Sequence, residues 1–207
     1  CGTLFPYTTL FRSHEIIDTN YYSYTEPERF CLMHHWGIGI IYYCLYNSAG
    51  FMGLSVLNCI VFLSAFLLFF VAGRNNAHFY ATLAVSFVAV KFITLRSEIR
   101  PEVVSYFFLS GYMYCLQGFK RDGKQVRLLF LLPFIQILWV NIHVFFVFGP
   151  YCVFVFFLDA LLNNDRWRRK VLGRVLLLTI AANIMNPFGV RAALEPLMLF
   201  RRGVSVV

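Results

Sequence analysis

The sequence has 207 residues, 59% of them hydrophobic, and a mean hydropathy of +0.67. A soluble domain of this length could not bury several apolar runs of membrane-spanning length, so we expect an all-α polytopic integral membrane protein. The net charge of +8 does not indicate nucleic-acid binding, because ten of the 18 Lys and Arg residues lie in three short segments between apolar runs rather than in one patch. These segments contain Arg74; Lys120, Arg121, Lys124 and Arg127; and Arg166, Arg168, Arg169, Lys170 and Arg174.

The first 50 residues are expected to lie outside the spanning bundle. Residues 1–13 resemble the translation of a common sequencing adapter, and we leave them out of the prediction of the fold. Residues 14–50 are expected to form an external loop that contains an interfacial helix. Residues 37–46 are apolar and aromatic but too short to cross a bilayer, and Ala49 and Gly50 are expected to end this helix.

Residues 51–207 are expected to form the helical bundle, truncated, with about six spanning helices. Residues 51–72 form an apolar run about 33 Å long at the helical rise. A tight turn with Arg74 leads to a second span over residues 78–95. Pro101 suits the first turn of a third span over residues 102–118, because the N–H that proline lacks has no partner at that position anyway.

The second half of the chain is expected to contain a helical hairpin. Basic loops are expected at residues 120–127 and 166–174, on both sides of two apolar segments, 128–140 and 144–162, so an even number of crossings must separate these loops. A hairpin that turns at Asn141–His143 meets this condition. Residues 175–184 then return across the bilayer to a turn at residues 186–189, and Asp159 is expected to pair with Arg166 or a neighbour.

The distribution of charge predicts an orientation. Short basic loops stay on the cytoplasmic side of a membrane. Counting crossings from them places four polar clusters on the opposite side: residues 33–36, 96–101, 141–143 and 183–189. This layout is typical of a membrane enzyme whose site is built from the ends of external loops.

Other sites find little support in the sequence. The six cysteines are scattered through apolar runs with no C-x-x-C spacing, so we interpret them as small buried side chains and predict no metal site from them. No P-loop, H-E-x-x-H or G-x-S-x-G motif occurs, so NTPase, metalloprotease and serine hydrolase functions are not indicated.

Six short motifs stand out along the chain: YSYTEP at 22–27, HHWG at 34–37, RPEVVSY at 100–106, LP at 132–133, WVNIH at 139–143 and NPFG at 186–189. In this order they resemble a family of bacterial polytopic membrane proteins classed with the GT-C glycosyltransferases. Protein O-mannosyltransferases and the aminoarabinose transferase that modifies lipid A are relatives of that family. The resemblance covers most of residues 14–200.

The resemblance implies transfer of a sugar from a polyprenyl-phosphate donor to a glycan, lipid or protein acceptor at the periplasmic face of the bacterial inner membrane. It also implies a catalytic aspartate early in the first external loop, upstream of the sequence given; Asp18 lies late in that loop, and Asn20 stands where many relatives carry an acid. No cofactor is indicated, and a divalent cation is left open. The alternative is a non-catalytic membrane protein, such as a glycolipid transporter or an envelope-assembly subunit.

Candidate catalytic residues are His35 and His143, because the pKa of histidine lies near the working pH and suits a general base. His34 and Trp36 are candidate substrate-binding residues, Trp36 by stacking on a sugar. The alternative for residues 34–36 is an anchor at the level of the lipid headgroups, with one histidine capping a helix.

Arg100 is the candidate clamp for the departing phosphate, with Glu98 beside it. The alternative is a salt-bridged turn between two helices. Asn141 and Asn186 are further candidate substrate-binding residues, because amides are costly in lipid unless they are paired. Alternatively, Asn141 satisfies backbone groups at the hairpin turn and Asn186 only shapes its own turn.

Overall fold

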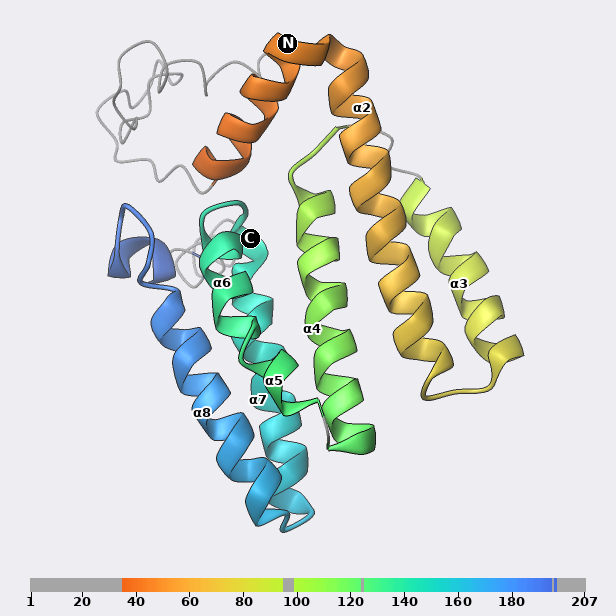
Figure 1. Ribbon diagram of the computed structural model, residues 1–207, viewed down its shortest axis with the longest axis vertical. Coiled ribbons are helices and arrows are strands. Elements are labelled where there is room, and N and C mark those ends of the chain that lie inside the picture. Colours follow the sequence, from red (N-terminus) through yellow and green to blue (C-terminus); the bar gives the residue numbers. More distant parts are fainter. Residues whose placement is uncertain (1–34, 95–98, 124, 195, 197–207) are drawn as a thin grey trace, which may run out of the picture.

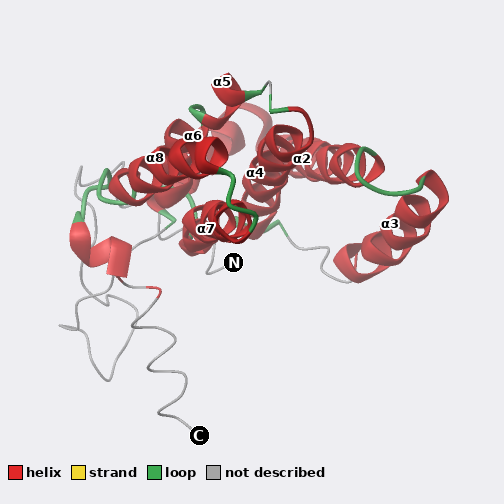
Figure 2. Cartoon of the chain, turned by 90° about the horizontal axis from the view of Figure 1, so that it is seen from below, coloured by secondary structure: helices red, strands yellow, loops and turns green. Residues whose placement is uncertain are grey.

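The computed structural model describes residues 35–94, 99–123, 125–194 and 196 (Figure 1). Regular secondary structure in these residues is helical throughout, which confirms the all-α prediction for this part of the chain (Figure 2). The elements are α2 (Trp36–Arg74), α3 (Phe79–Thr94), α4 (Glu102–Asp122), α5 (Val126–Leu129), α6 (Leu132–Val140), the 3-10 helix η1 (Val144–Val147), α7 (Phe148–Leu162) and α8 (Arg166–Ala182).

Helix α2 consists of two helical limbs joined at a sharp kink. Gly50 at the kink has φ 60° and ψ −156°, a conformation that only glycine adopts without strain. The limb over residues 36–49 therefore folds back from the long limb over residues 51–74 (Figure 1). The predicted short helix and its break at Ala49–Gly50 are confirmed, and the position of this helix at a membrane interface stays a prediction.

Within the described residues, two helical stretches are long and apolar enough to cross a membrane: Trp36–Arg74 and Val144–Leu162. In their apolar windows only 11% and 22% of the residues are buried. The core helix of a soluble protein would be mostly buried, so these two helices weakly favour a membrane protein. The other apolar helices, Phe79–Val90 and Val126–Val140, are shorter, so the predicted number of about six spans stays a prediction.

The core lies around α4, between α2 on one side and the group of α6, α7 and α8 on the other (Figures 1 and 2). Its largest fully buried side chains include Trp139, Tyr112, Phe119 and Phe146. Trp139 packs against Tyr112, with ring centroids 5.8 Å apart, and this contact joins α6 to α4. Helix α3 lies outside this core and exposes Tyr80 and Phe87.

The predicted basic loop over residues 166–174 is wrong, because these residues form the first half of α8. Asp165 caps the helix: its carboxylate accepts a hydrogen bond from the backbone N–H of Arg168, at 3.0 Å. Val171, Leu172 and Val175 then bury one face of the helix. A favourable N-cap and an apolar stripe outweigh the local run of charges, which the sequence analysis read as a loop.

The other basic loop is also shorter than predicted. Lys120 and Arg121 belong to the last turn of α4, which ends at Gly123 with φ 65°. The following apolar segment, residues 128–140, contains a break between α5 and α6, with Pro133 in the first turn of α6. Proline ends a preceding helix and suits the start of the next one.

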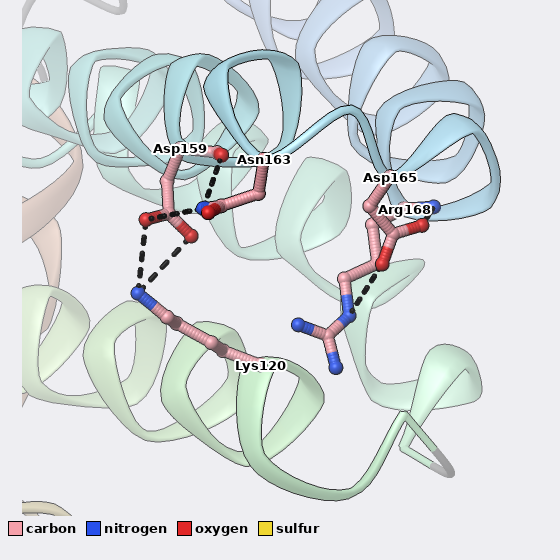
Figure 3. Close-up of polar contacts among 5 residues, drawn as sticks. All are labelled: Lys120, Asp159, Asn163, Asp165 and Arg168. Carbon is pink, nitrogen blue, oxygen red and sulfur yellow. Dashed lines mark hydrogen bonds and ion pairs between the residues drawn. The ribbon is translucent and has the colours of Figure 1, made fainter.

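Asp159 pairs with Lys120 and not, as predicted, with Arg166 or a neighbour. The Lys120 ammonium lies 3.1 Å and 3.0 Å from the two carboxylate oxygens of Asp159, while Arg168 turns to Asp165 at 3.4 Å (Figure 3). This pair joins α4 to α7, a proximity that spacing along the chain does not reveal. The three basic segments nevertheless lie at the same end of the bundle, the lower end in Figure 1.

Candidate functional site

The two candidate catalytic histidines lie against each other at the opposite end of the bundle. The rings of His35 and His143 stack with their centroids 4.8 Å apart and their planes 29° apart. Two further contacts hold this arrangement: Nδ1 of His35 lies 3.3 Å from the carbonyl oxygen of Ile142, and the N–H of Gly37 donates to the carbonyl of Asn141 at 3.0 Å. The start of α2 therefore packs directly on the hairpin turn between α6 and η1.

Gly37 permits this close approach. A Cβ atom at position 37 would lie 2.6 Å from the carbonyl oxygen of Asn141, a distance that real Cβ atoms essentially never show. Asn141 ends α6, and its side-chain amide donates to the carbonyls of Ile137 at 2.7 Å and Met185 at 3.0 Å. Asn141 thus links the start of α2, the end of α6 and the segment after α8, as its structural alternative predicted.

The hydrogen bonds of the two histidines assign their tautomers. A carbonyl oxygen can only accept, so Nδ1 of His35 carries its proton and Nε2 carries the lone pair when the ring is neutral. In His143, Nδ1 accepts a hydrogen bond from the N–H of Phe145 at 3.3 Å and caps η1, so the proton of the neutral ring is on Nε2. In the neutral pair, the basic nitrogen of His35 is therefore Nε2, and the N–H of His143 is also at Nε2.

Burial lowers the pKa of His35, and two weaker effects oppose it: the hydrogen bond with the Ile142 carbonyl and the negative charge of Glu102. His35 is therefore neutral at pH 7. His143 is only 5% exposed. A neutral imidazole is the form that a general base requires.

Arg100 and Glu102, at the start of α4, lie on the same side of the bundle as the histidines. The Arg100 guanidinium is 3.9 Å from the Glu102 carboxylate, and Glu102 in turn is close enough to raise the pKa of His35. The Arg100 side chain is 43% exposed, so it remains accessible to an anion from outside. The structure thus brings His35, His143, Asn141 and Arg100 to one region.

Asn186 forms the predicted turn, and the turn occupies its side chain. Its amide nitrogen donates to the carbonyls of Asn183 at 2.7 Å and Gly189 at 3.0 Å, and its oxygen accepts from the N–H of Phe188 at 2.8 Å. These contacts support the structural alternative over the binding role. Asn186 reaches the histidine region only indirectly, through the bond between Asn141 and Met185.

Of the other candidates, Trp36 is half-buried in the first turn of α2 beside His35, and His34 and Glu98 lie outside the described residues. Within the described part of the chain, no group of three or more His, Cys, Asp or Glu side chains could hold a metal ion. The side-chain oxygen of Asn141 is buried and has no hydrogen-bond partner there.

A buried polar network behind the hairpin turn was missed by the sequence analysis. Gln136 on α6 is completely buried; its amide nitrogen donates to the carbonyl of Phe146 at 2.8 Å and to the Asn183 side chain at 2.6 Å. Its oxygen accepts from the Tyr112 hydroxyl at 2.7 Å, and the single proton of that hydroxyl is shared with the Leu132 carbonyl, at 2.9 Å. A single glutamine inside an apolar run was the signal that could have revealed this network.

The network supports the candidate site from below. Gln136 holds the carbonyl of Phe146, three residues after His143, and it also holds Asn183 at the end of α8. Trp139 adds a second link, because its indole N–H donates to the hydroxyl of Ser105 on α4 at 2.9 Å. The turn that carries His143 is thereby fixed to α4, α6 and α8.

No protein-family model, curated protein or solved structure matches this chain. Kinship with the GT-C glycosyltransferases therefore stays a prediction of the sequence motifs.

Proposed function

We propose that this chain is part of a GT-C-like membrane glycosyltransferase. It would move a sugar from a polyprenyl-phosphate donor to a glycan, lipid or protein acceptor at the periplasmic face of the bacterial inner membrane. The observation that carries the proposal is the pairing of His35 with His143 beside Arg100, at the end of the bundle opposite the basic segments. Residues distant in sequence meet here and supply a neutral base and an exposed cation. This combination suits group transfer from a phosphate.

The proposed topology has six crossings: α2 after its kink, α3, α4, α5 with α6, η1 with α7, and α8. The limb of α2 before Gly50 would lie along the outer surface of the membrane. Basic residues in the last turns of α2 and α4 and at the start of α8 would face the cytoplasm. The many exposed apolar side chains, among them Phe51, Phe87 and Leu177, would then face lipid.

In the proposed reaction, Nε2 of His35 takes the proton of the acceptor hydroxyl. The hydroxyl oxygen forms a bond to the anomeric carbon of the sugar, and the bond from that carbon to the phosphate oxygen breaks. Arg100 holds the departing polyprenyl phosphate, and His143 packs against the ring of His35. Membrane lipids would surround the helices, and the reaction as written requires no cofactor.

A transfer assay with two designed variants tests this role. His35→Asn keeps a side-chain N–H that can donate to the Ile142 carbonyl but removes the basic Nε2. We expect at least about a 100-fold loss of radiolabelled sugar transfer in vesicles, the usual contribution of a general base. His78→Gln is the matched control, because His78 is exposed in the turn between α2 and α3. Transfer by His35→Asn at the wild-type rate removes His35 from the reaction.

The second candidate is a non-catalytic membrane protein, such as a glycolipid transporter or an assembly subunit. The observation that favours it is the structural use of the polar candidates: His143 caps η1 and Asn186 holds its own turn. Sugar transfer by the wild type discriminates between the two, because a transporter shows none. A glycosyltransferase transfers sugar and loses this activity in Arg100→Gln, which removes its phosphate clamp.

A further inference from the structure

A cavity lies away from the histidines, between α2 and α3. Its volume is about 570 Å³, within the range of small-ligand sites. Phe62, Phe66 and Phe70 of α2 and Val85 and Ala89 of α3 line it. The cavity extends toward the turn that joins the two helices, at the lower end in Figure 1.

One polar group that lines the cavity has no hydrogen-bond partner among the described residues. The Thr82 side chain lines the cavity and the residue is only 8% exposed, yet its hydroxyl has no hydrogen-bond partner among the described residues. The Thr82 backbone N–H donates to the His78 carbonyl at 3.0 Å, but the hydroxyl makes no corresponding bond to a carbonyl of its own helix. A buried hydroxyl without a partner is costly, so an acceptor supplied by a ligand would stabilise it.

One end of the cavity lies at the turn that joins α2 to α3. Gly73 and Ala77 line this end, and Arg74, which follows Gly73 in the last turn of α2, is exposed outside the lining. Thr82 lies next to Gly73, with its methyl group 3.1 Å from where a Cβ of Gly73 would be. A buried hydroxyl and an apolar channel therefore begin at a turn that carries an exposed cation.

We propose that this groove binds one anionic glycerophospholipid from the leaflet that faces the basic segments. The phosphate lies at Arg74, the uncharged ester carbonyl accepts a hydrogen bond from Thr82, and one acyl chain fills the channel between α2 and α3. A charged phosphate is too costly to bury at Thr82, so a lipid whose polar groups all sit in its phosphate, such as a polyprenyl phosphate, fits this order less well. The proposal rests on the membrane placement proposed above and is independent of sugar transfer.

Lipid retention tests the proposal directly. The full chain is reconstituted into vesicles of equal phosphatidylglycerol and phosphatidylcholine and extracted into detergent, and native mass spectrometry counts the lipids that remain bound. We expect one phosphatidylglycerol per chain. Retention of neither lipid, or of both lipids equally, would overturn the proposal.

Variants assign the retained lipid to the groove. Ala89→Phe fills the channel and should abolish retention, whereas Ala84→Phe, the same change on α3 outside this cavity, should leave it intact. Thr82→Val should weaken binding about 2- to 10-fold, as one lost hydrogen bond does. Arg74→Gln should lower the preference for phosphatidylglycerol about 5-fold, the contribution of one cation near an anionic surface. Unchanged retention in Ala89→Phe overturns the assignment.

Two further arms keep the test decisive. Phosphatidylglycerol with a photoreactive acyl chain should label the wild-type chain on residues 62–73 and 77–89, and even labelling of all apolar helices contradicts the proposal, whether or not any variant folds. Vesicles that also contain a polyprenyl phosphate test the other occupant, and its stoichiometric displacement of phosphatidylglycerol contradicts the assignment. Sugar transfer is measured on the same vesicles. Retained lipid without transfer contradicts the proposed glycosyltransferase function but still supports the lipid site.

Discussion

His35 and His143 are separated by more than a hundred residues, yet their rings stack with centroids 4.8 Å apart. His35 begins α2 and His143 begins η1, so the stacking joins the first described helix to the hairpin turn. Among the described residues, Glu102 and Arg100 at the start of α4 place charges near this contact. The proposed chemistry and the stability of the hairpin turn therefore depend on the same two side chains.

The contact between the histidines should weaken in acid. Burial lowers the pKa of His35, so the unfolded chain, in which the pKa is about 6.5, binds the proton more readily than the folded chain. The stability from neutral His35 is therefore fully present above about pH 6.5 and is lost as the pH falls through the lowered pKa. Glu102 partly offsets this loss, because its negative charge attracts the imidazolium.

Thermal unfolding in detergent between about pH 7.5 and pH 5 measures this effect. We expect the melting temperature of the wild type to fall more steeply than that of His35→Asn, which cannot take up the proton. His78→Gln, at the exposed turn, should follow the wild type. Parallel curves for the wild type and His35→Asn would show that His35 does not control acid stability.

Gly37→Ala should separate the start of α2 from the hairpin turn. The new Cβ would clash with the carbonyl oxygen of Asn141 and cost about 1–3 kcal/mol, as overpacking usually does. Gly111→Ala is the matched control, because a Cβ there meets nothing within 4 Å in the middle of α4 and should stabilise the helix by about 0.5–1 kcal/mol. Equal free energies of unfolding for the two variants, measured by denaturant titration, would exclude the close approach at Gly37.

Gln136→Leu should destabilise the protein strongly. It leaves the Asn183 side-chain oxygen and the Phe146 carbonyl without their buried donor, at about 1–3 kcal/mol for each. Asn183→Leu in the same background removes one of these two acceptors. We therefore expect the double variant to lose less free energy of unfolding than the sum of the single variants. Strictly additive losses would mean that Gln136 and Asn183 are not bonded.

Asp165 should contribute more to stability than the ion pair between Lys120 and Asp159, which Figure 3 also shows. Asp165→Ala removes the N-cap of α8 and should cost about 0.5–2 kcal/mol, whereas Asp165→Asn keeps an acceptor and should cost less. Lys120→Met breaks the ion pair with Asp159. Because the side chains of Lys120 and Asp159 are 53% and 38% exposed, this change should alter stability by less than about 1 kcal/mol. A larger effect for Lys120→Met than for Asp165→Ala contradicts this ranking.

Cysteine labelling tests the proposed topology. Met185 lies beyond α8 near the histidines, and Asn163 lies in the exposed turn between α7 and α8. Met185→Cys and Asn163→Cys therefore place one thiol at each end of α8. In a background without the natural cysteines, a thiol reagent that cannot cross the membrane should modify position 185 from the periplasmic side and position 163 only from the cytoplasmic side. The reverse pattern inverts the proposed orientation, and labelling of both positions from one side excludes a spanning α8.

Several local features could be predicted from sequence because they depend on neighbouring residues. The break at Gly50, the start of α4 after Pro101 and the turn at Asn186 follow from the backbone preferences of glycine, proline and asparagine. The same reasoning failed for residues 166–174, where the charges suggested a loop and the cap at Asp165 produced a helix.

The contacts of the candidate site were only partly predictable. Sequence reasoning placed His35, Arg100 and Asn141 on one face by counting crossings, but it could not show that His35 stacks on His143 or that Asn186 is occupied by its own turn. It also paired Asp159 with the wrong residue, because the nearest cation in space, Lys120, lies 39 positions away in sequence.

By itself, the sequence determined the helical class, the main helix breaks and the gathering of basic residues between apolar runs, since hydropathy and turn chemistry act over a few residues. Only the tertiary structure decided which polar side chains meet. The glycine at position 37 lets two backbones come into hydrogen-bonding distance, and the buried amide of Gln136 finds its partners across three helices. Such contacts depend on the packing of segments far apart in the chain, where no local pattern records them.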